Sequence, residues 1–377
     1  PQGQYMGKFK MISGYEPRFT SFSGGVYESE IIRSAINARA VHISKLKVEL
    51  VGSARPMLRT KLEKAPNQFM TWSQFLYRVS TILDINNTAF IVPVFDERMT
   101  ITGVYPVLPS SCSMVEYDDE IWLRYQFSNG QYAAVEFRKC AVLTKHQYKD
   151  DFFGSSNTPL HDTMQLIHIQ NQGIEEGVKS AATYRFYAQV NNFSKAEDLA
   201  KERQRFSEEN FSKDAKGGGL LLFPNTYSDI KQVESNPYTV DDKQMELIKN
   251  NVFDYFGVNE EIIQGKADSD KLDAFFNSAI EPFAIALSEA LSRAIYSERE
   301  RSYGNHVYVN ANRLQYMSQT AKVTVARDLG DRGILTINEI RELFNYAPLP
   351  NGDVAYIRGE YKPIEETEVN ENEQNDQ

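Results

Sequence analysis

The sequence is poor in features that several classes of protein need. Cysteine occurs only twice among 377 residues, at Cys112 and Cys140, so we expect a reducing compartment in which both are small buried apolar residues. No stretch approaches the roughly 18 uninterrupted apolar residues of a membrane helix, so no membrane association is expected. The N-terminal residues lack the apolar core of a signal peptide, and a start at Pro1 fits either removal of an initiator methionine or trimming.

Positive charge is scarce as well. The chain carries 41 Lys and Arg against 51 Asp and Glu, which gives a net charge of -10. Proteins that bind nucleic acid tightly concentrate Lys and Arg against the phosphates. The sequence therefore argues against a tight nucleic-acid binder, although it is compatible with DNA as a passenger.

The familiar catalytic motifs are missing too. The sequence has no GxxxxGK[ST] phosphate loop and no GxGxxG, GxSxG, HExxH or CxxC pattern. The glycines of "KGGGL" are not followed by Lys-Ser or Lys-Thr, which favours a turn over a phosphate cradle. His161 and His168 are two helical turns apart, too far to share a metal ion. We therefore predict no catalytic residue, no metal and no cofactor, and we expect the chain not to be an enzyme.

Residues 1–157 have the sequence pattern of a mixed α+β region. A helix followed by a strand is predicted by apolar residues at helical spacing, namely Ile32, Ile36, Ala40 and Ile43. A polar segment with prolines, residues 52–68, separates this helix from a second one over 71–85. Residues 86–136 are rich in Val, Ile, Phe and Tyr, and Ser128-Asn129-Gly130 between two strand-like stretches predicts a hairpin.

A long helix is predicted from residue 158 onward. Thr158 can cap it, with Pro159 at its first position. Its seam follows steps of four and three residues: Leu160, Met164, Ile167, Asn171, Ile174, Val178 and Ala181. Asn171 in this seam, with Gly173 and Gly177 nearby, does not suit an ordinary core helix, because an interior Gly costs about 1 kcal/mol relative to Ala. Two interpretations stay open: the helix breaks at Gly173, or it continues and packs closely against copies of itself.

Residues 184–237 form a small α/β insertion between two helices. A strand-like stretch is followed by a capping box of Ser194 and Glu197 and by a charged helix over 195–211, in which Glu197 and Lys201 can pair. Residues 216–224, "KGGGLLLFP", then predict a turn and a short strand. Such a charged helix is usually a solvated face.

The rest of the chain is mainly helical. Helices are predicted over 239–258, 272–301 and 318–333, with a loop at 259–271 and a strand at 306–312. Pro282 must kink or break the second of these helices. A last helix begins with a capping box of Thr336 and Glu339, should run to Tyr346 and stops before the turn of Asn351-Gly352-Asp353.

Six short motifs follow one another along most of the chain: "NNTAFIVPV" (86–94), "YPVLPSSCSMV" (105–115), "DDFFGSSNTPL" (150–160), "FGVNEEII" (256–263), "IEPFAIALSEAL" (280–291) and "DRGILTINEIRELFNYAPLPNGD" (331–353). In this order they resemble the portal proteins of tailed double-stranded DNA bacteriophages. The match departs from the family pattern in places, because Thr158 replaces a Ser, Asn259 and Glu260 replace two prolines, and one Gly is missing near Gly352.

This resemblance implies the portal fold, an α+β architecture. Residues 1–157 would form the mixed α/β wing, completed by 259–310 with the tunnel loop and a long kinked helix. The two stem helices would be 158–183 and 238–258, with the clip at 184–237 between them. Residues 311–363 would form a short helical crown, and the acidic tail 364–377 should be disordered.

The resemblance also implies a function. Portal proteins form a ring, commonly a dodecamer, at one vertex of the capsid, through which double-stranded DNA is packaged and later ejected. The expected partners are other copies of the chain, the terminase large subunit, the head-tail adaptor, and the major capsid and scaffold proteins. The expected location is the virion, after assembly in the host cytoplasm.

Three sets of candidate residues follow from the resemblance. The tunnel-loop set, expected to line the channel or else to be a plain surface loop, is Gln264, Lys266, Asp268, Asp270 and Lys271. The clip set, expected to face the terminase, is Glu197, Lys201, Arg203, Arg205 and Glu208. The stem set, expected between subunits, is Asn171, Gly173 and Gly177.

Two other functions compete with a structural DNA channel. One is a DNA-processing enzyme, a nuclease or an ATPase, against which the missing phosphate loop speaks. The other is a monomeric adaptor or head-assembly scaffold, which would form no ring.

Overall fold

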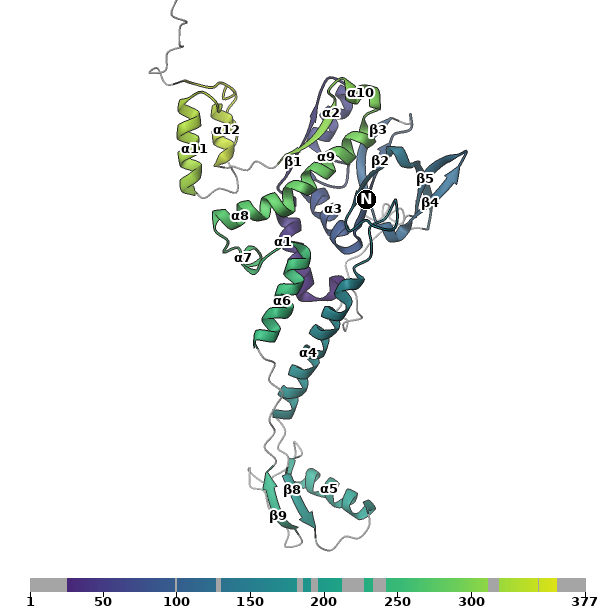
Figure 1. Cartoon of the computed structure of the whole chain (residues 1–377), viewed down its shortest axis with the longest axis vertical. Helices are drawn as coiled ribbons and strands as arrows, with labels where there is room; N and C mark the ends of the chain where they lie inside the picture. Colours follow the sequence, from purple (N-terminus) through teal and green to yellow (C-terminus); the bar gives the residue numbers. More distant parts are fainter. Residues whose placement is uncertain are drawn as a thin grey trace, which may run out of the picture. The chain divides into compact units, whose positions relative to one another are not determined.

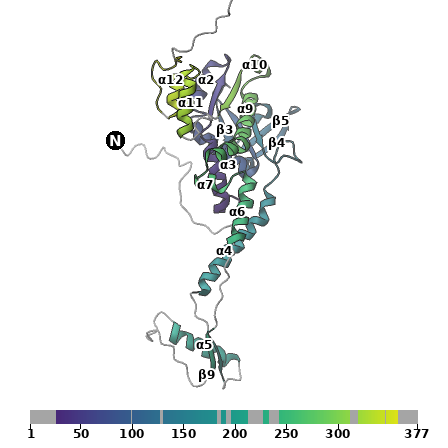
Figure 2. The ribbon, with the colours of Figure 1, turned by 60° about the vertical axis from the view of Figure 1, so that its left-hand side comes forward.

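The computed structural model of the chain describes residues 26–98, 100–126, 130–181, 186–190, 196–211, 227–232, 242–310, 319–344 and 346–357. The chain divides into two compact units. Unit 1 consists of Pro1–His161 and Lys249–Gln377, and unit 2 of Asp162–Ile248. Figures 1 and 2 show their elements.

Two helices of unit 1 pack against each other at the start of the described chain. They are α1 (Glu30–Ile43) and α3 (Trp72–Asn86). The four apolar residues that predicted α1 are all fully buried, namely Ile32, Ile36, Ala40 and Ile43. Thr71 and Gln74 form a capping box at the start of α3. Both predicted helices are thus confirmed.

A further helix, α2 (Pro56–Lys64), lies in the segment that the sequence analysis left without structure. Pro56 is in its first turn, where the missing N–H costs nothing, and only Leu58 and Leu62 are buried. Its contacts with the strands β1 (Lys47–Val51) and β3 (Ile101–Val107) stabilise it. Two apolar residues one turn apart are too weak a pattern to predict a helix from sequence alone.

Two three-stranded antiparallel sheets share the main β core of unit 1. The first has the order β3 (Ile101–Val107), β2 (Thr88–Phe95), β7 (Ala141–Thr144), and the second the order β4 (Cys112–Tyr117), β5 (Glu120–Gln126), β6 (Tyr132–Glu136). The predicted hairpin is confirmed, because Gln126 of β5 pairs with Tyr132 of β6. One apolar cluster connects the sheets: Phe90, Val92, Val107, Leu123, Val135 and Cys140.

Both cysteines lie at this core as free thiols, and the prediction that they are buried is confirmed for Cys140 but not for Cys112. Cys140 is buried and Cys112 is partly buried. Burial raises the pKa of the Cys140 thiol to about 12 and that of Cys112 to about 11. Both thiols are therefore poor nucleophiles.

A third sheet joins the two chain segments of unit 1. Strand β1 (Lys47–Val51) pairs antiparallel with β10 (His306–Asn310). Helix α9 (Glu281–Ile295) packs on β10 and on β7 and is followed by α10 (Glu298–Ser302). Arg55, the residue that precedes α2, binds both carboxylate oxygens of Glu300 at 2.8 and 2.9 Å, which ties the start of α2 to α10.

The predicted long helix contains a π-helical turn just before Pro282, and the chain stays helical from residue 269 to residue 295. Helix α8 (Ser269–Phe275) runs into a π-helical turn, Phe276–Ile280, directly before α9. Pro282 lies in the first turn of α9, so the wider turn precedes the residue that cannot donate a hydrogen bond. The helix ends at Ile295, earlier than predicted.

The last two helices, α11 (Gln319–Asp331) and α12 (Ile337–Leu343), lie side by side. The predicted capping box is present: the Thr336 backbone N–H donates to Glu339 Oε2 at 2.7 Å, and the Glu339 N–H donates to Thr336 Oγ1 at 3.2 Å. The helix ends at Leu343 rather than at Tyr346.

Unit 2 contains the remaining elements. Helix α4 (His161–Ala181) opens it, and α6 (Asp242–Phe256) leads back into unit 1. Between them, β8 (Phe186–Val190) pairs antiparallel with β9 (Tyr227–Gln232), and α5 (Ala196–Phe211) lies between these strands in sequence. The predictions for Ser194, for residues 216–224 and for the tail 364–377 concern positions outside the described residues.

Candidate functional site

The predicted tunnel loop is mostly helical, so the loop assignment was wrong. Helix α7 (Glu260–Gln264) and the start of α8 occupy the segment, and only residues 265–268 connect them. Asn259 Oδ1 accepts from the Ile262 N–H and Asp268 Oδ1 accepts from the Lys271 N–H, both at 2.9 Å. Gly265 ends α7 at φ 68°. Polar caps around two very short helices produced the loop-like sequence.

All five tunnel-loop candidates are exposed in this segment. Gln264 ends α7, Lys266 and Asp268 lie in the connection, and Asp270 and Lys271 lie in the first turn of α8. Figure 1 shows the two helices following α6 along the chain.

The charges of this segment largely pair with one another. Lys271 forms an ion pair with Glu261, and that hydrogen bond raises the pKa of the lysine. Lys266 Nζ donates to Gln264 Oε1 at 2.8 Å. Residues 259–271 contain four carboxylates and two lysines, a net charge of -2. The segment therefore offers no concentration of positive charge to a polyanion.

The "FGVNEE" motif, where α6 ends and α7 begins, has a structural explanation. The Gly257 N–H donates to Asp254 O at 3.1 Å and the Val258 N–H donates to Phe253 O at 2.9 Å, the hydrogen-bond pattern of a Schellman motif. Gly257 has the positive φ, 66°, that this helix end requires. Asn259, which stands where the family pattern has Pro, caps α7 instead.

Helix α4 runs unbroken through Gly173, so the interpretation that it breaks there was wrong. Its start also differs by one residue from the prediction. Asn157, not Thr158, precedes the helical turn Thr158–Leu160, and Pro159 is its second residue.

The predicted seam of α4 is buried only over its first half. Leu160, Met164 and Ile167 are buried, whereas Val178 is 66% exposed. A second line of residues at steps of three and four stays uncovered: Leu166 is 51% exposed, Ile169 is 53% exposed and Gly173 is half-buried. These three residues, here called the stem stripe, lie within an arc of about 60° on the helix.

The three stem candidates do not share one face. Gly177 continues the line of the stem stripe and is buried. Asn171 is exposed and lies about 160° around the helix from Gly173, because two residues turn an α-helix by about 200°. The structure thus brings the two glycines together on one face and leaves Asn171 on another.

The five clip candidates are all exposed on α5. Arg205 Nη2 pairs with Glu202 Oε1 at 2.7 Å, and Gln204 Nε2 donates to Glu208 Oε1 at 2.9 Å. The predicted pair of Glu197 and Lys201 is not among the ion pairs of the described residues. The helix presents both signs of charge to solvent.

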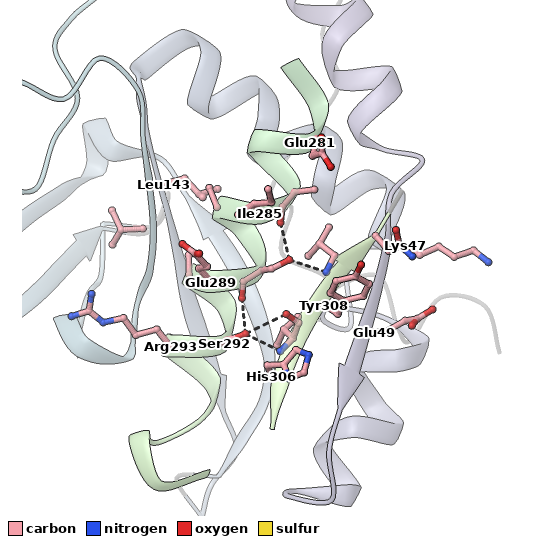
Figure 3. Close-up of a pocket in the computed structure, with 18 of the residues that line it drawn as sticks. Lys47, Glu49, Leu143, Glu281, Ile285, Glu289, Ser292, Arg293, His306 and Tyr308 are labelled. Atoms are coloured by element: carbon pink, nitrogen blue, oxygen red, sulfur yellow. Dashed lines mark hydrogen bonds between the residues drawn. The ribbon is translucent and has the colours of Figure 1, made fainter. Parts of the chain in front are cut away.

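An open groove of about 1570 Å³ follows the outer face of α9 (Figure 3). Ile285 on its floor is 54% exposed and is flanked along the helix by Glu281, Glu289 and Arg293. The sheet β1–β10 borders it with four side chains labelled in Figure 3, namely Lys47, Glu49, His306 and Tyr308.

Serines of α9 satisfy the backbone of β10 beneath this groove. Ser288 Oγ accepts from the Val309 N–H at 2.9 Å, and Ser292 Oγ accepts from the Val307 N–H at 2.8 Å (Figure 3). The donors of the strand edge are therefore used inside the unit and are not offered to another strand.

Among the residues that the structure describes, no group of three or more His, Cys, Asp or Glu side chains could hold a metal ion. No described helix is both long and apolar enough to cross a lipid bilayer.

Comparison with known proteins identifies the family. The profile of the phage portal protein family matches residues 30–345. The chain belongs to this family. A portal protein of Enterobacteria phage HK97 is 21% identical over 369 residues, covering 88% of this chain and 78% of the phage protein. Portal proteins form the connector ring at the capsid vertex, and the chain is such a subunit.

Solved structures agree with this portal fold. A chain in the neck of an empty gene transfer agent (GTA) particle, computed with C6 symmetry, has a TM-score of 0.57 at 13% identity, covering 86% of this chain and 92% of that one. A chain in the neck of the native particle, computed with C12 symmetry, has a TM-score of 0.55 with the same identity and coverage. At this identity the likeness shows the fold alone.

The longest portal motif, residues 331–353, is a set of local hydrogen bonds. Asn338 Nδ2 donates to Asp353 Oδ1 at 2.7 Å, and the Leu349 N–H donates to Asn338 Oδ1 at 2.8 Å. A Cβ at Gly352 would lie 2.1 Å from Asn338 Oδ1, so a larger residue there would displace the Asn338 amide from these bonds. Arg341 Nε donates to Ala347 O at 2.8 Å. The motif therefore encodes a helix and the turn that closes over it, not a catalytic site.

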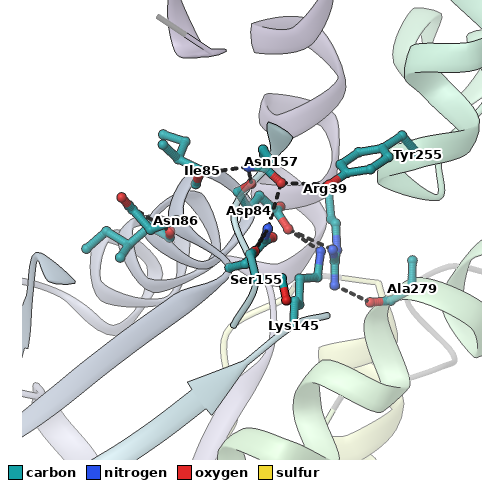
Figure 4. A network of polar contacts seen from close by, with 11 residues as sticks. Arg39, Asp84, Ile85, Asn86, Lys145, Ser155, Asn157, Tyr255 and Ala279 are labelled. Atoms are coloured by element: carbon teal, nitrogen blue, oxygen red, sulfur yellow. Dashed lines mark hydrogen bonds and ion pairs between the residues drawn. The ribbon is translucent and has the colours of Figure 1, made fainter. Parts of the chain in front are cut away.

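Sequence reasoning missed a buried polar network, shown in Figure 4. Asp84, 1% exposed in α3, binds Arg39 of α1 at 2.8 Å and Lys145 after β7. The only signal was an acid inside the apolar run "TILDI". Its partners lie 45 and 61 residues away, so no local pattern connects them.

Proposed function

We propose that copies of this portal protein contact one another and form a closed homo-oligomeric ring, a dodecamer by analogy with its family. Double-stranded DNA passes through the channel of this ring without being bound tightly. The ring acts at a capsid vertex of the virion, after assembly in the host cytoplasm, and carries out no catalysis. The observation that supports it most is the stem stripe.

The stem stripe supports a contact between subunits. Leu166 and Ile169 are half-exposed large apolar side chains, and Gly173 on the same line would let another helix approach closely. Covering each large side chain is worth roughly 1 kcal/mol or more. A ring supplies the same cover to every subunit, because a head-to-tail interface closes by rotation.

The tunnel-loop residues support passage of DNA. Their segment is exposed and carries a net charge of -2, with Lys271 paired to Glu261. Phosphate contacts that were favourable would become barriers to sliding, and this segment offers few. We place Gln264, Lys266, Asp268, Asp270 and Lys271 on the channel wall.

The clip helix supports exchange of partners at one end of the ring. Glu197, Lys201, Arg203, Arg205 and Glu208 are exposed charges of both signs. Exposed mixed charge favours contacts that form quickly and are released. We propose this face for the terminase large subunit and, after packaging, for the head-tail adaptor. Major capsid and scaffold proteins would contact other surfaces of the ring.

Ring formation is tested by adding charge to the stem stripe. The variant Leu166→Glu with Ile169→Glu should remain folded but lose the ring, because carboxylates cannot be buried against a neighbouring helix. The matched control, Gln165→Glu with Gln172→Glu, adds the same charge on exposed polar positions of the same helix. Size-exclusion chromatography with light scattering measures both. A ring in the first variant would contradict the proposal.

The channel position is tested with Gln264→Lys and Asp270→Lys together. Purified rings of this variant should retain linear duplex DNA about tenfold more tightly at low salt, with a steep salt dependence. Covalently closed circular DNA should not be retained, since it cannot thread a closed ring. The control, Gln131→Lys with Asp328→Lys, changes charge equally on exposed positions elsewhere. Equal retention of linear and circular DNA would show that the residues face the outside.

A further inference from the structure

One side chain in the buried network makes every hydrogen bond available to it. The Asn157 side-chain amide has two N–H donors and an oxygen that accepts two bonds. Its Nδ2 donates to Asp84 O at 3.1 Å and to Ile85 O at 2.7 Å. Its Oδ1 accepts from Asn87 Nδ2 at 2.7 Å and from the Tyr255 hydroxyl at 2.8 Å (Figure 4). Asn157 is 8% exposed, so losing a partner would leave a buried polar atom unsatisfied.

These four bonds connect the segment where the chain leaves unit 1 with the segment where it re-enters unit 1. Asn157 lies four residues before His161, the last residue before unit 2. Tyr255 lies in the last turn of α6, six residues after Lys249, where the chain returns. One hydrogen bond of 2.8 Å thus joins the outgoing segment directly to the incoming one.

The rest of the network fixes these two residues to the core of unit 1. Asn87 has φ 53° at the end of α3, and its Nδ2 also donates to Ser155 O at 2.7 Å. Gly154 passes so close that a Cβ would lie 2.2 Å from both Asn87 O and Lys145 O. The segment before α4 therefore has no room to move at Gly154 without breaking the contacts around Asn87.

The same network reaches the π-helical turn beyond the tunnel-loop segment. The backbone oxygen of Asp84 accepts from Asn157 Nδ2, and its carboxylate accepts from Arg39 Nη1. Arg39 Nη2 in turn donates to Ala279 O of the π-helical turn at 3.2 Å. Burial lowers the pKa of Lys145, which shares the Asp84 carboxylate. Three hydrogen bonds, by way of Asp84 and Arg39, thus connect Asn157 to the turn that precedes α9.

We infer that Asn157 is a positioning residue, which holds the outgoing segment before α4 and the incoming last turns of α6 at a fixed separation within unit 1 through its bond with Tyr255. The inference rests on the proposed ring, because α4 carries the stem stripe. A closed ring needs the same rotation between every pair of neighbours. If the segments around Asn157 and Tyr255 can move relative to each other, the rotation between neighbouring subunits varies. Rings with a wider range of subunit numbers then form, while unit 1 stays folded.

Two variants test this. Tyr255→Phe removes only the hydroxyl that donates to Asn157, and Asn157→Ala removes all four bonds. The control is Asn86→Ala, since the neighbouring Asn86 amide donates to Ile82 O in its own helix at 3.1 Å. Hydrogen–deuterium exchange and native mass spectrometry are measured on purified full-length protein.

In Tyr255→Phe, exchange should rise about fivefold in residues 249–256 and in the first turn of α4, and stay unchanged in α1 and β2. Rings should show a broader distribution of subunit number than the wild type or Asn86→Ala. A uniform rise over unit 1, or no rise in these two segments, would overturn the inference. If the wild type forms no ring, the proposed function fails, and local exchange alone still decides the role of Asn157.

Discussion

The two units of this portal protein differ in how they treat their apolar and polar groups. Unit 1 buries whole faces of α1, α3, β2 and α9, and its buried charges have partners. In the described part of unit 2, three large apolar side chains are buried, namely Met164, Ile167 and Ile248. Six are exposed there: Leu166, Ile169, Ile174, Val178, Leu199 and Leu247. Unit 1 therefore buries its apolar side chains within the chain, whereas unit 2 leaves most of its described large apolar side chains exposed, as expected of a surface that other molecules cover.

This difference explains why the sequence predicted that α4 is a helix but did not predict which of its residues are exposed. Burial in unit 1 is decided within the chain, so its stability should respond to single substitutions in the core. We propose that other subunits cover the apolar surface of α4, so substitutions there should change assembly and leave folding intact. The three predictions below test this contrast in descending order of effect.

The largest effect is expected from Asp84→Ala in unit 1. This change leaves Arg39 and Lys145 without the carboxylate that binds both. Breaking a buried pair in this way costs about 3–5 kcal/mol. Urea unfolding followed by tryptophan fluorescence should show the loss. Asp254→Ala, an exposed carboxylate of α6, should change the free energy of unfolding by less than about 0.5 kcal/mol. Similar values for the two variants would contradict the importance of the network.

Gly173→Leu in unit 2 is expected to have opposite effects on the stability of the subunit and on ring assembly. Leucine favours a helix over glycine by roughly 0.5–1 kcal/mol, so the isolated subunit should be no less stable. A bulky side chain on the stem stripe should weaken ring assembly, since overpacking costs about 1–3 kcal/mol per contact. Gln172→Leu adds the same side chain on an exposed polar position one residue away and should leave assembly unchanged. Sedimentation velocity at several concentrations distinguishes the two.

The smallest effect is expected at the predicted crown. Replacing Thr336 and Glu339 by Ala removes the capping box and should cost on the order of 1 kcal/mol. Amide exchange should increase in α12, while the ring forms as in the wild type. Loss of the ring would show that residues 336–343 do more than close their own turn.

Sequence reasoning succeeded where local patterns decide the structure. The Ile32–Ile43 spacing gave α1, and the Thr336–Glu339 box gave the start of α12. It failed where short helices depend on caps, because Asn259, Gly265 and Asp268 looked like a loop. It also failed where residues distant in sequence are in contact, since no residue near Asp84 indicates that Asp84 binds Arg39 and Asn157. The candidate residues of the site were placed by family resemblance, and their exposure came only from the structure.

Ring formation by the full-length wild-type chain is the central claim, and native mass spectrometry at micromolar concentration tests it most directly. The account predicts one dominant closed oligomer, with negative-stain images showing a ring around an open centre. A folded monomer with no larger species would contradict it, and the exposed residues of the stem stripe would then need a different partner.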